Sequence, residues 1–368
     1  MKTTKLSLVL TAFVAWMPTV SVLGQDFEFD TGSNESDGDI VINENTVLSL
    51  PPDGIFHTKR FEVGTGVTLS FEPNALNTPV VILASGQVLI TGNINITGSP
   101  GNNTVGGLGG PGGGRGGYPG AENQPPGDGH GIGGGIAGEG GRHAAIGIGN
   151  LTQFPPSTGS GGGGSITKGG GGGGGSITIG SRVRIVLDGT IIASGGVAGG
   201  GSGPGSGGSV RFVAPTITGR GSTDVAGAAA RGWVRFDVID PTGIISINKG
   251  DPSTFSIGSN MAMFPPKIPR LNIIRVAGRD IAEPPTEPVT IVLPFGSDPT
   301  QSVILRAHDF DAVMPITVAV TPLYGPRMLF EAMVDNLQTN PADVVVAVEL
   351  PINVAADISA WTRPPAQE

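Results

Sequence analysis

Residues 183–195 read Val183-Arg-Ile-Val-Leu-Asp-Gly-Thr-Ile-Ile-Ala-Ser-Gly195: an alternating run, a glycine corner, and a second run that ends in glycine. Related stretches begin at Val88, Val210 and Val234, and the starts at 183, 210 and 234 are 27 and 24 residues apart. Periods of about 20 to 50 residues indicate a solenoid. Short strands at this period predict circuits of chain that bury alternate Val, Ile and Leu side chains against the circuits above and below.

The inward side chains of such circuits are those two positions apart in each run. We expect them to be Val183, Ile185, Leu187, Val210, Phe212, Val234 and Phe236. An antiparallel sandwich also has short strands and turns. The recurrence of one motif on both sides of a long glycine tract favours the solenoid.

That tract separates two of the repeats and holds most of the glycine: 45 of the 64 glycines lie between residues 101 and 210. Glycine runs have no side chains with which to form a core. We therefore expect an insertion of about 99–182 that leaves one side of the solenoid and returns. Its runs either pack as polyproline-II-like segments joined by amide hydrogen bonds or remain mobile. We expect partial order with mobile stretches between, so that deletion of the tract barely affects the scaffold.

Glycine becomes rare after a proline-bearing linker, 251–270. Seven short alternating runs follow and predict an immunoglobulin-like or fibronectin-type β-sandwich over 271–368. The predicted strands are 271–276, 289–293, 302–307, 316–320, 328–334, 344–350 and 354–361.

The N-terminus predicts export. Lys2 and Lys5 precede a mostly apolar segment, and a cut before Gln25 defines a signal peptide of residues 1–24. Residues 25–38 form an acidic lead, which a solvated cap explains more simply than a calcium site. Cysteine is absent and the net charge is −9, so we expect neither a disulfide framework nor a nucleic-acid partner. The predicted location is secreted, at the cell surface or periplasmic, without a transmembrane segment after signal cleavage.

Residues 207–219, Gly-Gly-Ser-Val-Arg-Phe-Val-Ala-Pro-Thr-Ile-Thr-Gly, are similar to glycine-rich coils of secreted bacterial surface proteins. So is the stretch that begins Asp37-Gly-Asp-Ile-Val-Ile. Over about 37–250 the chain resembles the pectin-lyase-like right-handed parallel β-helix superfamily and adhesin-type passengers. The resemblance implies an all-β fold with a right-handed parallel β-helix over 39–250. It implies no single function, because that superfamily contains both enzymes and inert scaffolds.

Candidate chemistry is sparse, and we predict no catalytic residues, metal site or cofactor. The histidines are dispersed and are most simply polar residues of loops and strand ends; they are His57, His130, His143 and His308. Glycine-hinged loops are also poor supports for a preorganised metal or catalytic site.

Three arginines share the second position of three repeats: Arg184, Arg211 and Arg235. In-register stacking would place them in a ladder on one face, where like charges need an anionic partner. The ladder could bind an anionic glycan, or it could be a structural row partnered by Asp237.

These observations predict an exported, non-enzymatic structural or adhesion protein of the bacterial surface or extracellular matrix. Its expected partners are an extracellular glycan or further copies of itself. The alternative is a polysaccharide lyase or glycoside hydrolase on the same scaffold. The resemblance allows this, because β-helix enzymes cleave acidic polysaccharides with charged residues stacked on adjacent coils.

Overall fold

The computed structural model describes residues 29–139, 158–250 and 254–362. The predicted signal peptide, the start of the acidic lead and His143 lie outside these described residues. The described part of the chain is nearly all β, and it includes a short 3-10 helix, η1 (Pro241–Ser246). No helix in the described part of the chain combines the length and apolar character that a membrane crossing requires.

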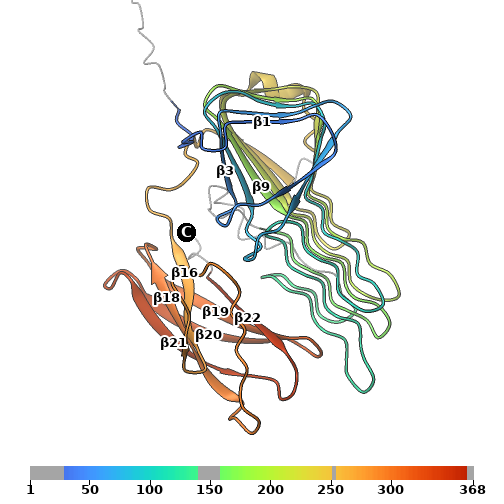
Figure 1. The fold of residues 1–368 in the computed structure, drawn as a ribbon, viewed down its shortest axis with the longest axis vertical. Coiled ribbons are helices and arrows are strands. Elements are labelled where there is room, and N and C mark those ends of the chain that lie inside the picture. The colour runs from blue at the N-terminus through green and yellow to red at the C-terminus, as the bar shows by residue number, and fades with distance from the viewer. Residues whose placement is uncertain (1–28, 140–157, 251–253, 363–368) are drawn as a thin grey trace, which may run out of the picture.

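The N-terminal body has three parallel faces, here called sheets A, B and C, that the chain visits in turn (Figure 1). One long strand belongs to both A and C and joins them into a single ten-stranded sheet. Sheet A contains β1 (Asp39–Ile42), β4 (Arg60–Val63), β7 (Val88–Ile90), β10 (Ile185–Leu187) and the end of β12 (Ser209–Thr218). Sheet B contains β2 (Thr46–Ser49), β5 (Thr68–Glu72), β8 (Asn93–Asn95), β11 (Thr190–Ile192) and β13 (Ser222–Asp224). Sheet C contains β3 (Ile55–Thr58), β6 (Val80–Ala84), β9 (Ser176–Ser181), the first part of β12, β14 (Trp233–Asp240) and β15 (Phe255–Gly258). Each circuit of chain therefore adds one strand to each sheet.

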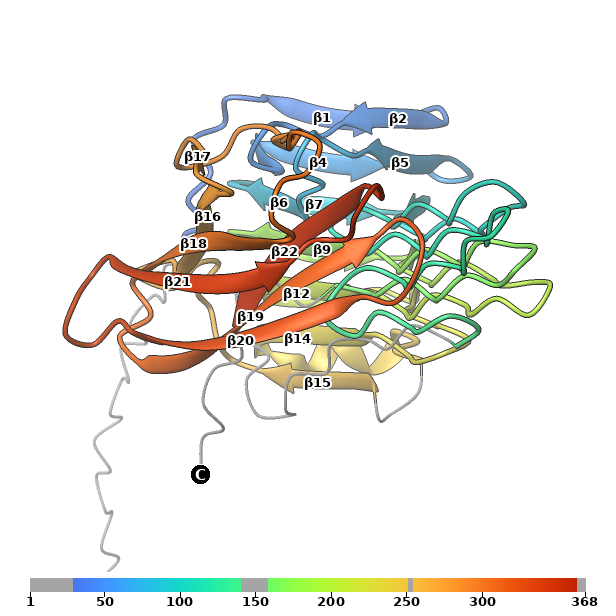
Figure 2. The same ribbon diagram turned by 90° about the horizontal axis from the view of Figure 1, so that it is seen from below.

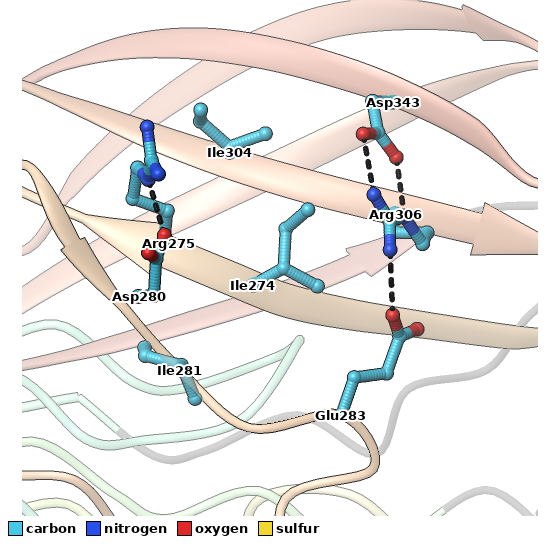
Figure 3. Close-up of a pocket in the computed structure, with 8 residues that line it drawn as sticks. All are labelled: Ile274, Arg275, Asp280, Ile281, Glu283, Ile304, Arg306 and Asp343. Atoms are coloured by element: carbon cyan, nitrogen blue, oxygen red, sulfur yellow. Dashed lines mark hydrogen bonds and ion pairs between the residues drawn. The ribbon is translucent and has the colours of Figure 1, made fainter.

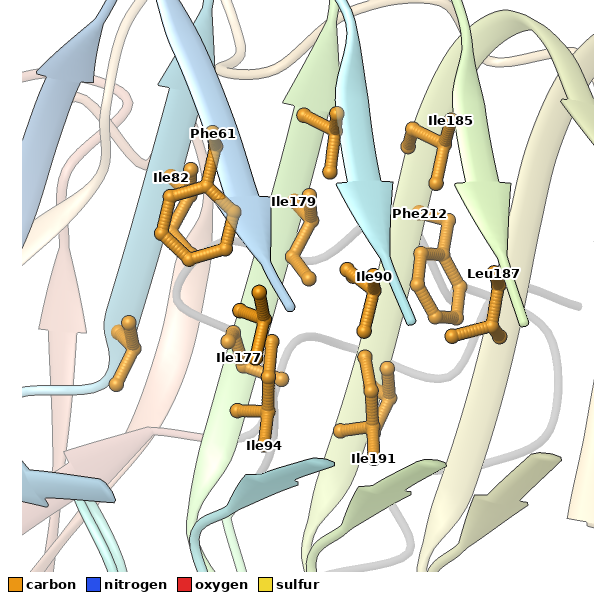
Figure 4. Close-up of a cluster of buried hydrophobic side chains, with 14 of the residues drawn as sticks. Phe61, Ile82, Ile90, Ile94, Ile177, Ile179, Ile185, Leu187, Ile191 and Phe212 are labelled. Atoms are coloured by element: carbon orange, nitrogen blue, oxygen red, sulfur yellow. The ribbon is translucent and has the colours of Figure 1, made fainter. Parts of the chain in front are cut away.

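Alternation places the apolar side chains of all three sheets in one core (Figure 4). In sheet A, for example, Phe61 pairs with Val88 and Val88 with Ile185, and all three side chains are fully buried. In sheet C the rings of Phe212 and Phe236 stack with their centroids 5.1 Å apart. Successive circuits thus bury like positions against one another, as the repeat predicts.

Six of the seven predicted inward side chains are buried, but Val183 is 52% exposed. The reason is register: Ile185, rather than Val183, pairs with Val88. Val210 pairs with Ile177 on one side and Val234 on the other. The counterpart of Val210-Arg-Phe is therefore Ile177-Thr-Ile in β9. Since β9 lies inside the predicted insertion of about 99–182, the insertion is shorter than expected and sheet C resumes at residue 176.

The C-terminal domain consists of two antiparallel sheets that share a second core. One sheet has the order β17 (Arg279–Asp280), β16 (Arg270–Val276), β18 (Thr300–His308) and β21 (Ala342–Glu349). The other has the order β20 (Met328–Asp335), β19 (Val313–Pro322) and β22 (Ala356–Thr362). Six predicted strands correspond to these elements, whereas 289–293 is not a strand. The linker is also shorter than the predicted 251–270, because residues 255–258 form β15 of sheet C.

Residues 260–263, which follow β15 in the predicted linker, cover the outer face of sheet C. Met263 packs there against Val81, Leu83 and Val213, together with Phe29 from the acidic lead. The lead is therefore not wholly solvated, because one of its apolar side chains covers a sheet. This arrangement brings the C-terminal domain alongside sheet C and the glycine-rich segments (Figure 1).

Candidate functional site

The glycine-rich segments project from one corner of the body, where the chain passes from sheet B to sheet C. Residues 96–175 connect β8 to β9, residues 193–208 connect β11 to β12, and residues 225–232 connect β13 to β14. Figure 2 shows these segments as a stack of wavy, extended traces beside the sheets. We call this assembly the glycine array.

The run of seven glycines at 169–175 lies at the centre of the array, and all seven backbone N–H groups donate hydrogen bonds. Gly169, Gly172 and Gly175 donate to the segment 96–102. Gly170 and Gly173 donate to the segment 114–117, and Gly171 and Gly174 to the segment 203–206. Successive residues therefore point to three neighbours in rotation. Such a period of three is that of the polyproline-II helix, which has three residues per turn and no internal hydrogen bonds.

The carbonyl groups of the same run reach three further neighbours. Gly170 and Gly173 accept from Gly107 and Gly110. Gly171, Gly172 and Gly174 accept from Gly162, Gly196 and Gly159, respectively. The central segment thus has six hydrogen-bonded neighbours. Over the described residues the array corresponds to the first of the two arrangements considered for the tract, polyproline-II-like segments joined by amide hydrogen bonds.

Close packing around the central run explains why every residue in it is glycine. A Cβ atom added at any position from 169 to 175 would lie less than 3.0 Å from a neighbouring backbone atom. At Gly172 the nearest such atom is the carbonyl oxygen of Leu108. The hydrogen in place of that Cβ therefore points towards a carbonyl oxygen, which is the geometry of a Cα–H···O contact.

Segments at the edge of the array carry a side chain at every third position. The two clear cases are Gly106-Gly-Leu-Gly-Gly-Pro111 and Gly113-Gly-Arg-Gly-Gly-Tyr118. An edge segment has neighbours on two of its three faces, so one residue in three is free to face outward. Leu108 does so and is 65% exposed. The Gly-Gly-x spacing was the signal in the sequence that could have identified this packing.

The segments reverse direction at turns that gather at the far end of the array. Gly120 donates to the carbonyl of Ser165 at 2.9 Å, and the Ser165 hydroxyl donates to the carbonyl of Gly200 at 2.8 Å. Gly169 donates to the carbonyl of Asn102 at 2.8 Å. We define the distal surface as these joined turns, which comprise residues 102–105, 120–124, 165–168 and 197–201.

Aliphatic side chains protrude from the distal surface. Ile166 is 78% exposed, Val197 is 66% exposed and Val105 is 39% exposed. Hydroxyl, amide and ammonium groups accompany them, including Thr104, Asn103 and Lys168 at the same turns. Turns held by a hydrogen-bonded array present these groups on a fixed support, which favours a binding surface.

The C-terminal domain docks on another edge of the array through charged groups. A carboxylate oxygen of Asp357 in β22 lies 2.9 Å from His130 Nε2 and 3.0 Å from Arg115 Nη2. Asp128 accepts from the backbone N–H of Arg327 at 3.0 Å. The hydrogen bond from His130 holds the pKa of Asp357 below its usual value, although burial opposes this.

The three predicted arginines do not form one ladder. Arg211 and Arg235 face each other in sheet C, whereas Arg184 precedes β10 of sheet A and hydrogen-bonds to Gln87. Arg184 is exposed, and a role in glycan binding stays a prediction for all three. Asp237 joins the other two: it accepts from Arg211 Nε at 3.0 Å and from Arg235 Nη2 at 2.7 Å.

Arg211 is 5% exposed and Asp237 is fully buried, because residues 260–263 cover them. The Arg211 guanidinium also donates to the carbonyl of Ala262 at 2.9 Å. Burial lowers the pKa of Arg211, although the charge of Asp237 opposes this. Arg211 and Arg235 therefore form a structural row partnered by Asp237. The hydrogen bonds from Arg211 also hold the linker against sheet C.

An open hollow of about 400 Å³ lies on the C-terminal domain between β16, β18 and the residues after β17 (Figure 3). Its charged groups pair with one another: Arg306 binds Asp343 at 2.7 and 2.8 Å and Glu283 at 3.1 Å. His308 lies 2.6 Å from the same Glu283. This network braces the sheet, and its mutual neutralisation leaves little charge directed at a ligand.

No group of three His, Asp or Glu side chains with metal-site geometry occurs within 29–139, 158–250 and 254–362. No protein-family model, curated protein or solved structure matches this chain.

Proposed function

We propose that the chain is an exported structural or adhesion protein of the bacterial surface or extracellular matrix. In this proposal the three parallel sheets are a right-handed parallel β-helix of the pectin-lyase-like type, and the C-terminal domain is an immunoglobulin-like sandwich. The recurrence of strands in sheets A, B and C supports the first assignment, and the two antiparallel sheets with one core support the second.

The observation that carries the proposal is the distal surface at the far end of the glycine array. It gathers turns from several segments, and it exposes Ile166 and Val197 beside hydroxyl and amide groups. Exposed apolar side chains bordered by polar groups are typical of an interaction site. Hydroxyl and amide groups provide both donors and acceptors for a glycan. An extracellular glycan is therefore the proposed ligand.

The test is binding of the purified chain to a panel of immobilised extracellular polysaccharides. Ile166→Asp combined with Val197→Asp should weaken binding at least tenfold, because it places two charges on the apolar part of the surface. Ile245→Asp is the matched control: this residue of η1 is 81% exposed and lies away from the turns, so binding should not change.

Equal binding by the turn variant and the control would contradict a role for the distal surface, as would no binding of the unsubstituted chain to any polysaccharide. Release of unsaturated or reducing sugar from the panel would instead support the enzymatic alternative.

A further inference from the structure

The outward side chains of sheet B line up across its strands. Alternation turns every second residue of each strand away from the core, and the parallel register sets these residues opposite one another. The first outward residues of β5, β8, β11 and β13 are Thr68, Asn93, Thr190 and Ser222. We call these four the polar row, because each carries a small hydroxyl or amide side chain.

The sheet holds the polar row in place. β5, β8 and β11 each pair with a strand on both sides, and the hydroxyl oxygens of Thr190 and Ser222 lie 2.9 Å apart in a hydrogen bond. Within the described parts of the chain, the side chains of Thr68 and Asn93 hydrogen-bond to no other residue. They are therefore available to a ligand as both donors and acceptors, on a fixed support.

A second outward row runs beside the polar row and is partly apolar. Its members are Val47, Ser70, Asn95, Ile192 and Asp224. Val47 is 67% exposed. Hydroxyl and amide groups beside aliphatic carbon suit a pyranose ring, which carries hydroxyl groups at its rim and C–H groups on its faces.

Charge decides which glycans this face suits. The outward positions of β2, β5, β8, β11 and β13 carry two charged groups, Glu72 and Asp224, each at the last residue of its strand. Both are acidic, and no outward position of these five strands is Lys or Arg. A polyanion would meet like charge there without any counter-charge. The face therefore favours an uncharged ligand.

We propose that the outer face of sheet B is a second binding site, for an uncharged linear polysaccharide that lies along the polar row. Neighbouring strands are about 4.7–4.9 Å apart, and a pyranose in an extended β-linked chain advances by a similar distance. Each strand of the row thus offers one polar side chain to one sugar residue.

The location of this site is independent of the distal surface, which lies at the far end of the glycine array. The C-terminal domain lies on the side of sheet C, away from the polar row (Figure 1). The class of ligand rests on the proposed function, since both invoke a glycan. The inference adds where such a glycan lies and that it is uncharged.

Repetition along the row predicts that affinity grows with the length of the glycan. We would titrate the purified chain with β-linked glucan oligosaccharides from the disaccharide upward, by calorimetry. The tetrasaccharide should bind at least tenfold more tightly than the disaccharide, because it reaches all four strands of the polar row. The same glucan oxidised to carry carboxylates should bind at least tenfold more weakly. Equal affinity for the two lengths, or tighter binding of the oxidised glucan, would overturn the proposal.

Thr68→Val combined with Thr190→Val removes two hydroxyls of the row and keeps the β-branched shape that strands favour. Binding of the tetrasaccharide should weaken at least tenfold. The matched control is Thr216→Val with Thr218→Val, the same change on either side of the buried Ile217 in β12, on the outer face of sheet A. Both variants should keep the thermal transition of the unsubstituted chain.

The outcomes separate this site from the proposed function. Unchanged binding by the sheet B variant, together with weaker binding by Ile166→Asp with Val197→Asp, would overturn the polar row and leave the distal surface as the glycan site. No binding of the unsubstituted chain to any glycan would contradict both.

Discussion

Single glycines determine the packing of the array, and Gly172 is the clearest case. Its backbone N–H binds Ser99 and its carbonyl accepts from Gly196, while its α-hydrogen points at the carbonyl of Leu108. The side that a side chain would occupy is therefore already filled by backbone. At this residue the stabilising free energy comes from backbone hydrogen bonds, each worth about 0.5–1.5 kcal/mol net. They offset the backbone freedom that glycine loses, roughly 0.5–1 kcal/mol relative to Ala.

Gly172→Ala should lower the free energy of unfolding by about 1–3 kcal/mol or more, because the new methyl group forces neighbouring backbone apart. Gly199→Ala is the matched control, since a Cβ there would meet only the Lys168 side chain, at 3.8 Å from Cδ. Its effect should stay within about 0.5 kcal/mol. Denaturant unfolding of the two variants measures the difference, and similar small losses for both would mean that the central run is not close-packed.

At the scale of elements, the inward and outward alternation of the strands could be predicted from the sequence. The neighbours of the glycine runs could not. The inward side chains of β10, β12 and β14 follow from a period of two, because alternate residues of each strand face the core that the three sheets share. The register predicted for Val183 is wrong because the Val-Arg repeat falls in two different sheets. Val183-Arg184 precedes β10 of sheet A, whereas the other two copies lie in β12 and β14 of sheet C. A run such as 169–175 has no side-chain pattern, so its six neighbours could not be predicted individually.

The predicted strand 289–293 shows a different limit of the sequence. Its composition is correct for a strand, but a strand also needs a partner, and composition does not specify one. Likewise, the shared position of the three arginines predicts one ladder, but Arg211 is buried beneath the linker and Arg184 precedes a strand of another sheet. The distal surface could not be predicted, because its residues come together only when the array folds.

The contact between β22 and the glycine segment 127–131 should be sensitive to acid. The hydrogen bond from His130, aided by the charges of His130 and Arg115, lowers the folded-state pKa of Asp357. A carboxyl with a lowered pKa stabilises the contact above its unfolded pKa of about 3.9. That contribution is lost as the pH falls through the folded value. The docking of the C-terminal domain should therefore weaken below about pH 4.

Small-angle scattering between neutral pH and about pH 3 can follow this change as an increase in the radius of gyration. Asp357→Asn should show a larger radius already at neutral pH and little further change on acidification, because no carboxylate is left to protonate. Glu331→Gln, at an exposed position of β20, should behave like the unsubstituted chain. Identical profiles for all three proteins would rule out the Asp357 contact as the acid-sensitive element.

At the scale of the molecule, the sheets and the array form one continuous structure. Gly175 donates to the carbonyl of Ile96, and Ser176, the first residue of β9, donates to the carbonyl of Pro111. Asn77, at the same corner one circuit earlier, hydrogen-bonds to Gly112 and Gly113. The array is therefore anchored to adjacent circuits. In contrast to the expectation from sequence, deletion of 106–175 should destabilise the sheets, because it removes the centre of this packing.

Hydrogen exchange at residues 169–175 tests this account most directly, because all seven backbone N–H groups of the run are donors to other segments. Amides in a hydrogen-bonded core exchange only when the structure opens, with a free energy that approaches that of global unfolding. Under native conditions we expect the peptide that contains 169–175 to retain deuterium protection comparable to that of β9 and β12. Exchange of this peptide at the rate of an unstructured chain, while the strands remain protected, would contradict the packed array.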